Sequence, residues 1–144
     1  KMFSRDDIDT NFIDRSFNNA KTRTRQRTKN QMRNDKSNEF NLSKDYLVDL
    51  MVEQNFRCAL SNIPITTTFK DKRKASLDRI DPRGGYIRGN VRWVFYKLNS
   101  HKTWDDDMFN IMVGHLYKNR AKVIERYCRN AGILKCDILV HLNS

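Results

Sequence analysis

Apolar residues recur in short groups, and their spacing predicts two helices in the first part of the chain. Ile8, Phe12 and Ile13 are spaced as on one face of a helix. Ser43 suits the N-cap of a second helix and Asp45 suits its first turn, because their side chains favour those positions. The stripe of this second helix that should pack on the core consists of Leu47, Leu50, Met51 and Gln54.

A different pattern follows, which predicts a strand, a turn, a second strand and a helix. Residues 75–80 form a short apolar run, and residues 91–94 are β-branched and aromatic. The pair Gly84 and Gly85 between these runs marks a turn. Residues 96–103 are types that helices tolerate. Trp93 and Val91 should share the strand face that fills the core, although Trp93 could instead stack on a base.

After residue 104 the apolar positions return to helical spacing. Asp105–Asp107 suits a helix N-terminus, and Gly132 suits a helix end. The tail 138–142 is a short apolar run that could be a strand or a docked extension. The length of 144 residues fits a single α+β domain. We expect a basic N-terminal helix or arm over residues 1–42, a core with its preceding helix over 43–104, and a C-terminal helical segment over 105–144.

Basic residues greatly outnumber acidic ones. The 28 Lys and Arg residues against 17 Asp and Glu give a formal net charge of +11. This excess favours a polyanionic partner, with nucleic acid first and an anionic membrane surface second. Residues 15–36 hold eight basic side chains and one acid, which indicates a basic helix or arm followed by a loop at 34–41, although a solvated charged helix would look the same. The candidate nucleic-acid contacts there are Arg23, Arg25, Arg27 and Lys29.

A second basic group surrounds the predicted turn. Residues 69–102 hold ten basic and three acidic side chains, and Arg83, Arg88 and Arg92 lie in or beside the turn. Two basic clusters around one hairpin favour a protein that grips a nucleic-acid backbone, with an affinity that falls steeply as salt rises.

The number and spacing of the cysteines indicate the redox state of the compartment and bear on a structural metal ion. Cys58, Cys128 and Cys136 are odd in number and have no paired spacing, which favours reduced thiols in the cytoplasm or another reducing intracellular compartment. We do not expect a structural zinc ion, because such sites usually show local ligand pairs. The chain has no apolar run long enough to span a membrane, and its charged N-terminal residues do not resemble a secretory signal.

The predicted hairpin resembles a known family. The pattern reads Ser-Leu-Asp-Arg-Ile-Asp at 76–81, Gly-Tyr at 85–86, Gly-Asn-Val-Arg-Trp-Val at 89–94 and Asn-Ser-His-Lys at 99–102. In combination it resembles the HNH, or ββα-metal, endonucleases, especially a branch common in phages and mobile elements, and the match covers about residues 43–104. The resemblance implies a ββα-metal hairpin-plus-helix core surrounded by additional helices. It also implies a divalent-metal-dependent endonuclease that cuts or nicks DNA, double-stranded DNA first, by phosphodiester hydrolysis.

The same resemblance assigns roles to particular residues. The family positions matched by Asp78 and Asn99 bind the metal ion, and their oxygen atoms suit Mg²⁺ or Mn²⁺. Asn90 matches the residue that braces the loop, and Lys102 matches a lysine that contacts phosphate. Taken singly, Asp78 could be an ordinary strand-end acid, Asn99 a polar residue on a helix surface, and Lys102 an exposed charge.

One position departs from the family pattern. The usual general base is a histidine directly after the first acid, and this chain has Arg79 there, whose pKa above 12 excludes that role. Arg79 would instead clamp a phosphate or stabilise transition-state charge. A metal-bound water could also lose its proton without a dedicated side chain. The side chains that could act as base or orient water are Tyr96, Tyr86, Asp81 and His101, of which His101 should point away from the Asn99 face of its helix.

Two other functions fit the same features. A non-catalytic nucleic-acid-binding module could keep the hairpin after loss of the base, and Arg79 keeps this alternative open. A basic RNA-binding protein would carry the same charge, but it gives no reason for the Asp78 and Asn99 pair. The sequence leaves the oligomeric state open.

Overall fold

The chain divides into two compact units, residues 1–100 and 101–144. Each is described by itself, and our expectation of one domain stays a prediction. The computed structural model describes residues 2–29, 36–101, 114, 117–118 and 120–132. The predicted acidic helix start at 105–107 and the tail at 138–142 lie outside these residues.

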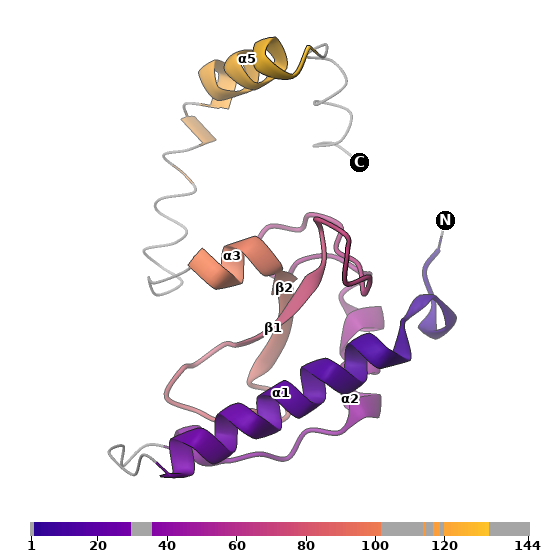
Figure 1. Cartoon of the computed structure of the whole chain (residues 1–144), viewed down its shortest axis with the longest axis vertical. Helices are drawn as coiled ribbons and strands as arrows, with labels where there is room; N and C mark the ends of the chain where they lie inside the picture. Colours follow the sequence, from indigo (N-terminus) through magenta and orange to yellow (C-terminus); the bar gives the residue numbers. More distant parts are fainter. Residues whose placement is uncertain (1, 30–35, 102–113, 115–116, 119, 133–144) are drawn as a thin grey trace. The chain divides into compact units, whose positions relative to one another are not determined.

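The first unit begins with a 3-10 turn, η1 (Arg5–Asp7), followed by a long helix, α1 (Thr10–Lys29). Phe12 and Ile13 are buried on α1, which confirms the predicted N-terminal helix. Ile8 is also buried, but our placement of it on the same helical face was wrong, because it lies between η1 and α1 in an extended conformation. In Figure 1, α1 runs alongside the hairpin of the first unit.

A second short turn, η2 (Lys36–Asn38), lies within the segment that we expected to be a loop, and it precedes helix α2 (Lys44–Glu53). Ser43 is the N-cap of α2, as predicted: its hydroxyl accepts a hydrogen bond of 3.1 Å from the backbone N–H three residues on. Leu47 and Met51 are completely buried. The predicted core-facing stripe of this helix is therefore confirmed at Leu47 and Met51.

The sheet consists of two antiparallel strands, β1 (Ala75–Arg79) and β2 (Val91–Phe95), and helix α3 (Tyr96–His101) follows β2 directly. Asp78 on β1 lies opposite Arg92 on β2. These elements agree in type and order with the predicted strand, turn, strand and helix, and the last two positions of the predicted helix lie outside the described residues. The mixture of helices with a two-stranded sheet confirms the α+β class.

The core of the first unit is centred on Trp93. Its side chain is completely buried, and its indole N–H donates to the backbone oxygen of Leu47 at 3.0 Å. The amide of Gln54 accepts from the backbone N–H of Trp93 at 2.9 Å and donates to its oxygen at 2.8 Å. The ring of Phe12 lies 6.1 Å from that of Trp93, measured between centroids. Trp93 thus joins β2, α2 and α1 and has no surface left for base stacking.

The second unit contains helix α5 (Arg120–Ala131). Gly132, with φ of 66°, follows its last residue, and a left-handed residue at this place is a common helix end. The prediction that Gly132 ends a helix is thus confirmed. Within the described part of the chain, no helix is long and apolar enough to cross a membrane.

Candidate functional site

The hairpin pairs Asp78 with Arg92. These residues face each other across β1 and β2, and Nε and Nη2 of Arg92 each lie 2.9 Å from Oδ2 of Asp78. The Asp78 side chain is 15% exposed and the Arg92 side chain 12% exposed. The arginine that we expected to contact nucleic acid is therefore a mostly buried ion-pair partner of the candidate metal ligand.

Asn99 reaches β1 from helix α3. Its Nδ2 donates to Oγ of Ser76 at 2.8 Å and lies 3.4 Å from the backbone oxygen of Leu77. Ser76 and Asp78 are two residues apart on one strand, so their side chains project from the same face. The hydrogen bond therefore holds Asn99 over the strand face that carries Asp78. Because the amide nitrogen is used by Ser76, the amide oxygen is the atom that Asn99 can offer to a cation.

Asn90 spans the turn between the two strands. Its Oδ1 accepts from the N–H of Asp81 at 2.9 Å, and its Nδ2 donates to the oxygens of Asp81 at 3.1 Å and Gly85 at 2.9 Å. A Cβ atom at Gly85 would lie only 2.0 Å from the backbone oxygen of Glu39. The turn is thus fixed from within by Asn90 and from outside by the neighbouring segment.

Arg79, in the place where the family has its base, is directed into the same turn. Its Nη1 donates to the backbone oxygens of Pro82 and Gly84, each at 2.8 Å. Its guanidinium carbon lies 5.5 Å from the centroid of the Tyr86 ring. Arg79 therefore stabilises the turn in this structure, a role that the sequence did not reveal.

Tyr86 is surrounded by three arginines. Its side chain is 3% exposed, and its hydroxyl accepts from Nη1 of Arg23 at 3.3 Å. The guanidinium of Arg27 lies 5.4 Å from the ring centroid, in addition to that of Arg79. Two of the expected nucleic-acid contacts on α1 thus point to the hairpin, and the hydroxyl that we considered for orienting water is engaged by Arg23.

The other predicted site residues lie at different places. Tyr96 is 42% exposed at the start of α3, with Nζ of Lys74 4.3 Å from its ring centroid. The guanidinium of Arg88 lies 5.6 Å from the ring centroid of Tyr46 on α2, and its backbone N–H donates to Oδ1 of Asn41 at 2.7 Å. Arg25 and Lys29 are exposed on α1. Lys102 and the side chain of His101 lie outside the part that the structure describes.

Arg83 forms an ion pair with Asp81 in the turn. Its Nε lies 3.1 Å from Oδ1 and its Nη2 lies 3.3 Å from Oδ2. The hydrogen bonds from the Arg83 side chain, and next the one from its backbone N–H, hold the pKa of Asp81 below its ordinary value. Arg83 and Arg92, both expected to bind nucleic acid, thus have carboxylate partners within the hairpin.

The cysteines do not gather around a metal site in the described residues. Cys58 is buried in the first unit, where its sulfur accepts from the N–H of Phe95 at 3.2 Å, and Cys128 is buried on α5. Cys136 lies outside the described part. No group of three or more His, Cys, Asp or Glu side chains is placed to hold a metal ion in that part. The candidate site of Asp78 and Asn99 has only one such side chain, so this finding does not bear on it.

A cavity between α1 and β1 contains residues that the sequence did not single out. Arg15, Lys74 and Ser76 line it together with Arg23, and its volume is about 210 Å³. Ser76 is the residue that also binds Asn99. The sequence signal for this surface was the recurrence of polar residues every four positions on α1, at Arg15, Asn19 and Arg23, which places them on one side of the helix.

Comparisons with known proteins found no match to this chain among protein-family models, curated proteins or solved structures.

Proposed function

We propose that the chain is a divalent-metal-dependent DNA endonuclease of the HNH type, with Asp78 and Asn99 as ligands of Mg²⁺ or Mn²⁺. The observation that carries the proposal is the Asn99 to Ser76 hydrogen bond of 2.8 Å. It orients the amide of a helix residue over the strand face that bears Asp78, and it leaves the amide oxygen for a cation. One carboxylate and one amide oxygen are donors that suit a hard cation, with water and phosphate at the remaining positions.

The surrounding residues would support this site from the protein side. Asn90 and Arg79 hold the turn that begins where β1 ends, so the end of the strand that carries Asp78 has little freedom to move. Arg92 fixes the orientation of the Asp78 carboxylate. A divalent cation at the site would polarise the phosphate and activate a water molecule. Lys102 keeps its proposed role as a phosphate contact.

A second function is favoured by two specific contacts. Arg92 neutralises the carboxylate that should bind the metal ion, and Arg79 occupies the place of the base and binds the turn. Both contacts suit a non-catalytic nucleic-acid-binding module built on the same hairpin. Under this alternative the basic residues would bind the backbone without cutting it.

Nicking of supercoiled plasmid DNA with Mg²⁺ or Mn²⁺ separates the two functions. Asp78→Asn keeps the size of the side chain, and we expect it to lower the metal-dependent rate about 100-fold or more, because a neutral ligand holds less firmly the cation that would stabilise transition-state charge. Asp45→Asn is the matched control, because that carboxylate is 89% exposed on α2, and its rate should equal that of the unchanged protein.

Two results would count against the enzyme. If the unchanged protein binds DNA but shows no metal-dependent nicking on single- or double-stranded substrates, the binding module is the correct function. If Asp78→Asn nicks as fast as the control, Asp78 is not a metal ligand. Salt-matched competition between DNA and RNA tests the RNA-binding alternative, which requires a preference for RNA.

A further inference from the structure

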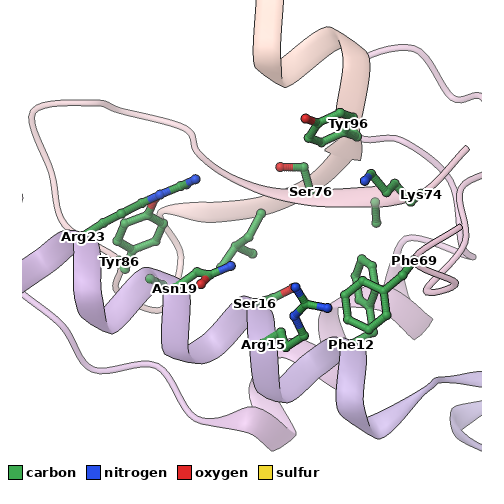
Figure 2. A pocket seen from close by; sticks show the side chains of 13 residues that line it. Phe12, Arg15, Ser16, Asn19, Arg23, Phe69, Lys74, Ser76, Tyr86 and Tyr96 are labelled. Atoms are coloured by element: carbon green, nitrogen blue, oxygen red, sulfur yellow. The ribbon is translucent and has the colours of Figure 1, made fainter. Parts of the chain in front are cut away.

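The cavity between α1 and β1 has two walls of different origin. Figure 2 shows Arg15, Asn19 and Arg23 projecting from α1 toward the strand, while Lys74 and Ser76 lie along the opposite wall, with the Ser76 hydroxyl on the side of Tyr96. The α1 residues are spaced by four, so they form one row along the helix. The volume of about 210 Å³ leaves room for a phosphodiester group between the two walls.

The cations of this cavity contact aromatic groups, and no carboxylate in the described part of the chain neutralises them. Arg15 lies over the ring of Phe69 at 4.3 Å, and Lys74 lies over that of Tyr96 at 4.3 Å. Arg23 donates to the hydroxyl of Tyr86 at 3.3 Å. Among the described residues, none of these three cations has an acidic partner, and no acidic residue lines the cavity.

Two arginines of the hairpin, in contrast, are paired with carboxylates. Arg83 is paired with Asp81 and Arg92 with Asp78, so each of these positive charges is largely cancelled at short range. In the cavity the aromatic rings fix the cations in place and leave their charge uncancelled. The positive potential around the hairpin should therefore be concentrated between α1 and β1, more than at Arg83 and Arg92.

The cavity also adjoins the candidate metal site. Ser76 lines the cavity, and its hydroxyl accepts from Asn99. A group bound between Arg15, Arg23 and Lys74 would thus lie beside Ser76, two residues from Asp78 along β1. A nucleic-acid backbone presents phosphates at regular intervals, so one phosphate in the cavity would place a neighbouring one near the end of β1 that carries Asp78.

We propose that this cavity is a phosphate-binding subsite that holds one backbone phosphate of the nucleic acid beside the candidate catalytic face. This subsite rests on the proposed function only because it takes nucleic acid as the partner. It does not require that the protein cut the nucleic acid. Arg15, Arg23 and Lys74 supply the charge, and Ser16, Asn19 and Ser76 offer polar groups around it.

The test places a negative charge inside the cavity and compares it with the same charge outside. Asn19→Asp is isosteric and lines the cavity, whereas Asn18→Asp makes the same change at the adjacent exposed position of α1. Binding to a fluorescent DNA duplex is measured by anisotropy with EDTA present. We expect about tenfold weaker binding for Asn19→Asp, and less than about twofold for Asn18→Asp, because a charge repels a phosphate strongly only at short range.

A second pair of variants removes a positive charge. Lys74→Gln should lower the slope of log K against log salt by about one, as loss of one phosphate contact does, whereas Lys72→Gln, on the exposed loop nearby, should not. Thermal unfolding of each variant shows whether the fold is kept. This pair provides an independent result if either asparagine variant unfolds.

The outcomes separate the subsite from the enzyme. If DNA binds but the cavity variants behave as their controls do, the subsite is wrong and the endonuclease proposal stands. If Asn19→Asp weakens binding of a protein that never nicks DNA, the subsite stands and the enzyme fails. If the unchanged protein binds neither DNA nor RNA, or binds only anionic vesicles or inorganic polyphosphate, both proposals are overturned.

Discussion

The ion pair between Asp78 and Arg92 should contribute measurably to stability. The change is made in three variants, Asp78→Asn, Arg92→Gln and the double substitution, which form a double-mutant cycle. Both side chains are mostly buried, with 15% and 12% exposed, and two nitrogen atoms share one carboxylate oxygen at 2.9 Å. Because water reaches the pair so little, screening is weaker here than for exposed ion pairs.

The magnitude follows from this geometry. Two unit charges about 4 Å apart attract each other by about 4 kcal/mol at an effective dielectric of about 20, and the loss of hydration on burial offsets part of that. Charge-assisted hydrogen bonds contribute a net of about 1.5–3 kcal/mol each. We therefore expect a coupling energy of about 2 kcal/mol between Asp78 and Arg92.

Urea unfolding at neutral pH, followed by tryptophan fluorescence, gives the free energy of unfolding of all four proteins. A coupling energy below about 0.5 kcal/mol is the range of exposed pairs, and it would refute our description of the Asp78 and Arg92 pair as mostly buried. The unchanged protein and the double variant share the same net charge, which controls for long-range electrostatic effects.

The same variants test competition at the metal site. If a divalent cation binds Asp78, removal of the neighbouring guanidinium should strengthen that binding, because two cations no longer share one carboxylate. Mg²⁺ should then raise the unfolding temperature of Arg92→Gln more than that of the unchanged protein, as binding to the folded state requires. The double variant should not respond, and an equal rise in all proteins would indicate nonspecific salt effects.

Two further predictions concern the turn. Gly85→Ala should lower the free energy of unfolding by about 3 kcal/mol, because the added Cβ would lie 2.0 Å from a backbone oxygen. Gly89→Ala should lower it by about 1 kcal/mol, because φ is 84° there but the space around it is open. Equal losses in urea unfolding would contradict the close approach at Gly85. The lowered pKa of Asp81 means that its pairing with Arg83 stabilises the fold above about pH 4 and that this contribution is lost as the pH falls through the folded-state pKa. The melting-temperature difference between the unchanged protein and Arg83→Gln should therefore disappear in strong acid, and a difference that persists there would show that Arg83 acts through packing.

Local features of the fold were predictable because neighbouring residues determine them. Ser43 can cap α2 through its own side chain, and the burial of Leu47 and Met51 follows from helical spacing. The strands were predictable from β-branched and aromatic runs. Ile8 shows the limit of this reasoning, since the spacing of buried residues continued beyond the true start of the helix.

Side-chain partners in the site were much harder to predict. Asp78 pairs with Arg92 because of strand register, and Arg79 binds carbonyl groups because of the path of the turn. Several arginines near the turn have the same local sequence environment, so composition cannot decide which of them is neutralised. The row formed by Arg15 and Arg23 was present in the sequence, but the wall opposite it depends on how α1 packs against β1.

The attachment of α1 has a consequence for the energetics of the proposed binding to nucleic acid. Many polycationic segments are disordered until they meet nucleic acid, and ordering them then opposes binding. In this chain Phe12 and Ile13 anchor the helix in the core. Arg23 and Arg27 of the same helix contact the hydroxyl and the ring of Tyr86. The conformational entropy of the basic helix is thus lost during folding rather than during binding to the proposed nucleic-acid partner. Association should accordingly resemble the docking of a rigid body, with little heat-capacity change from coupled folding.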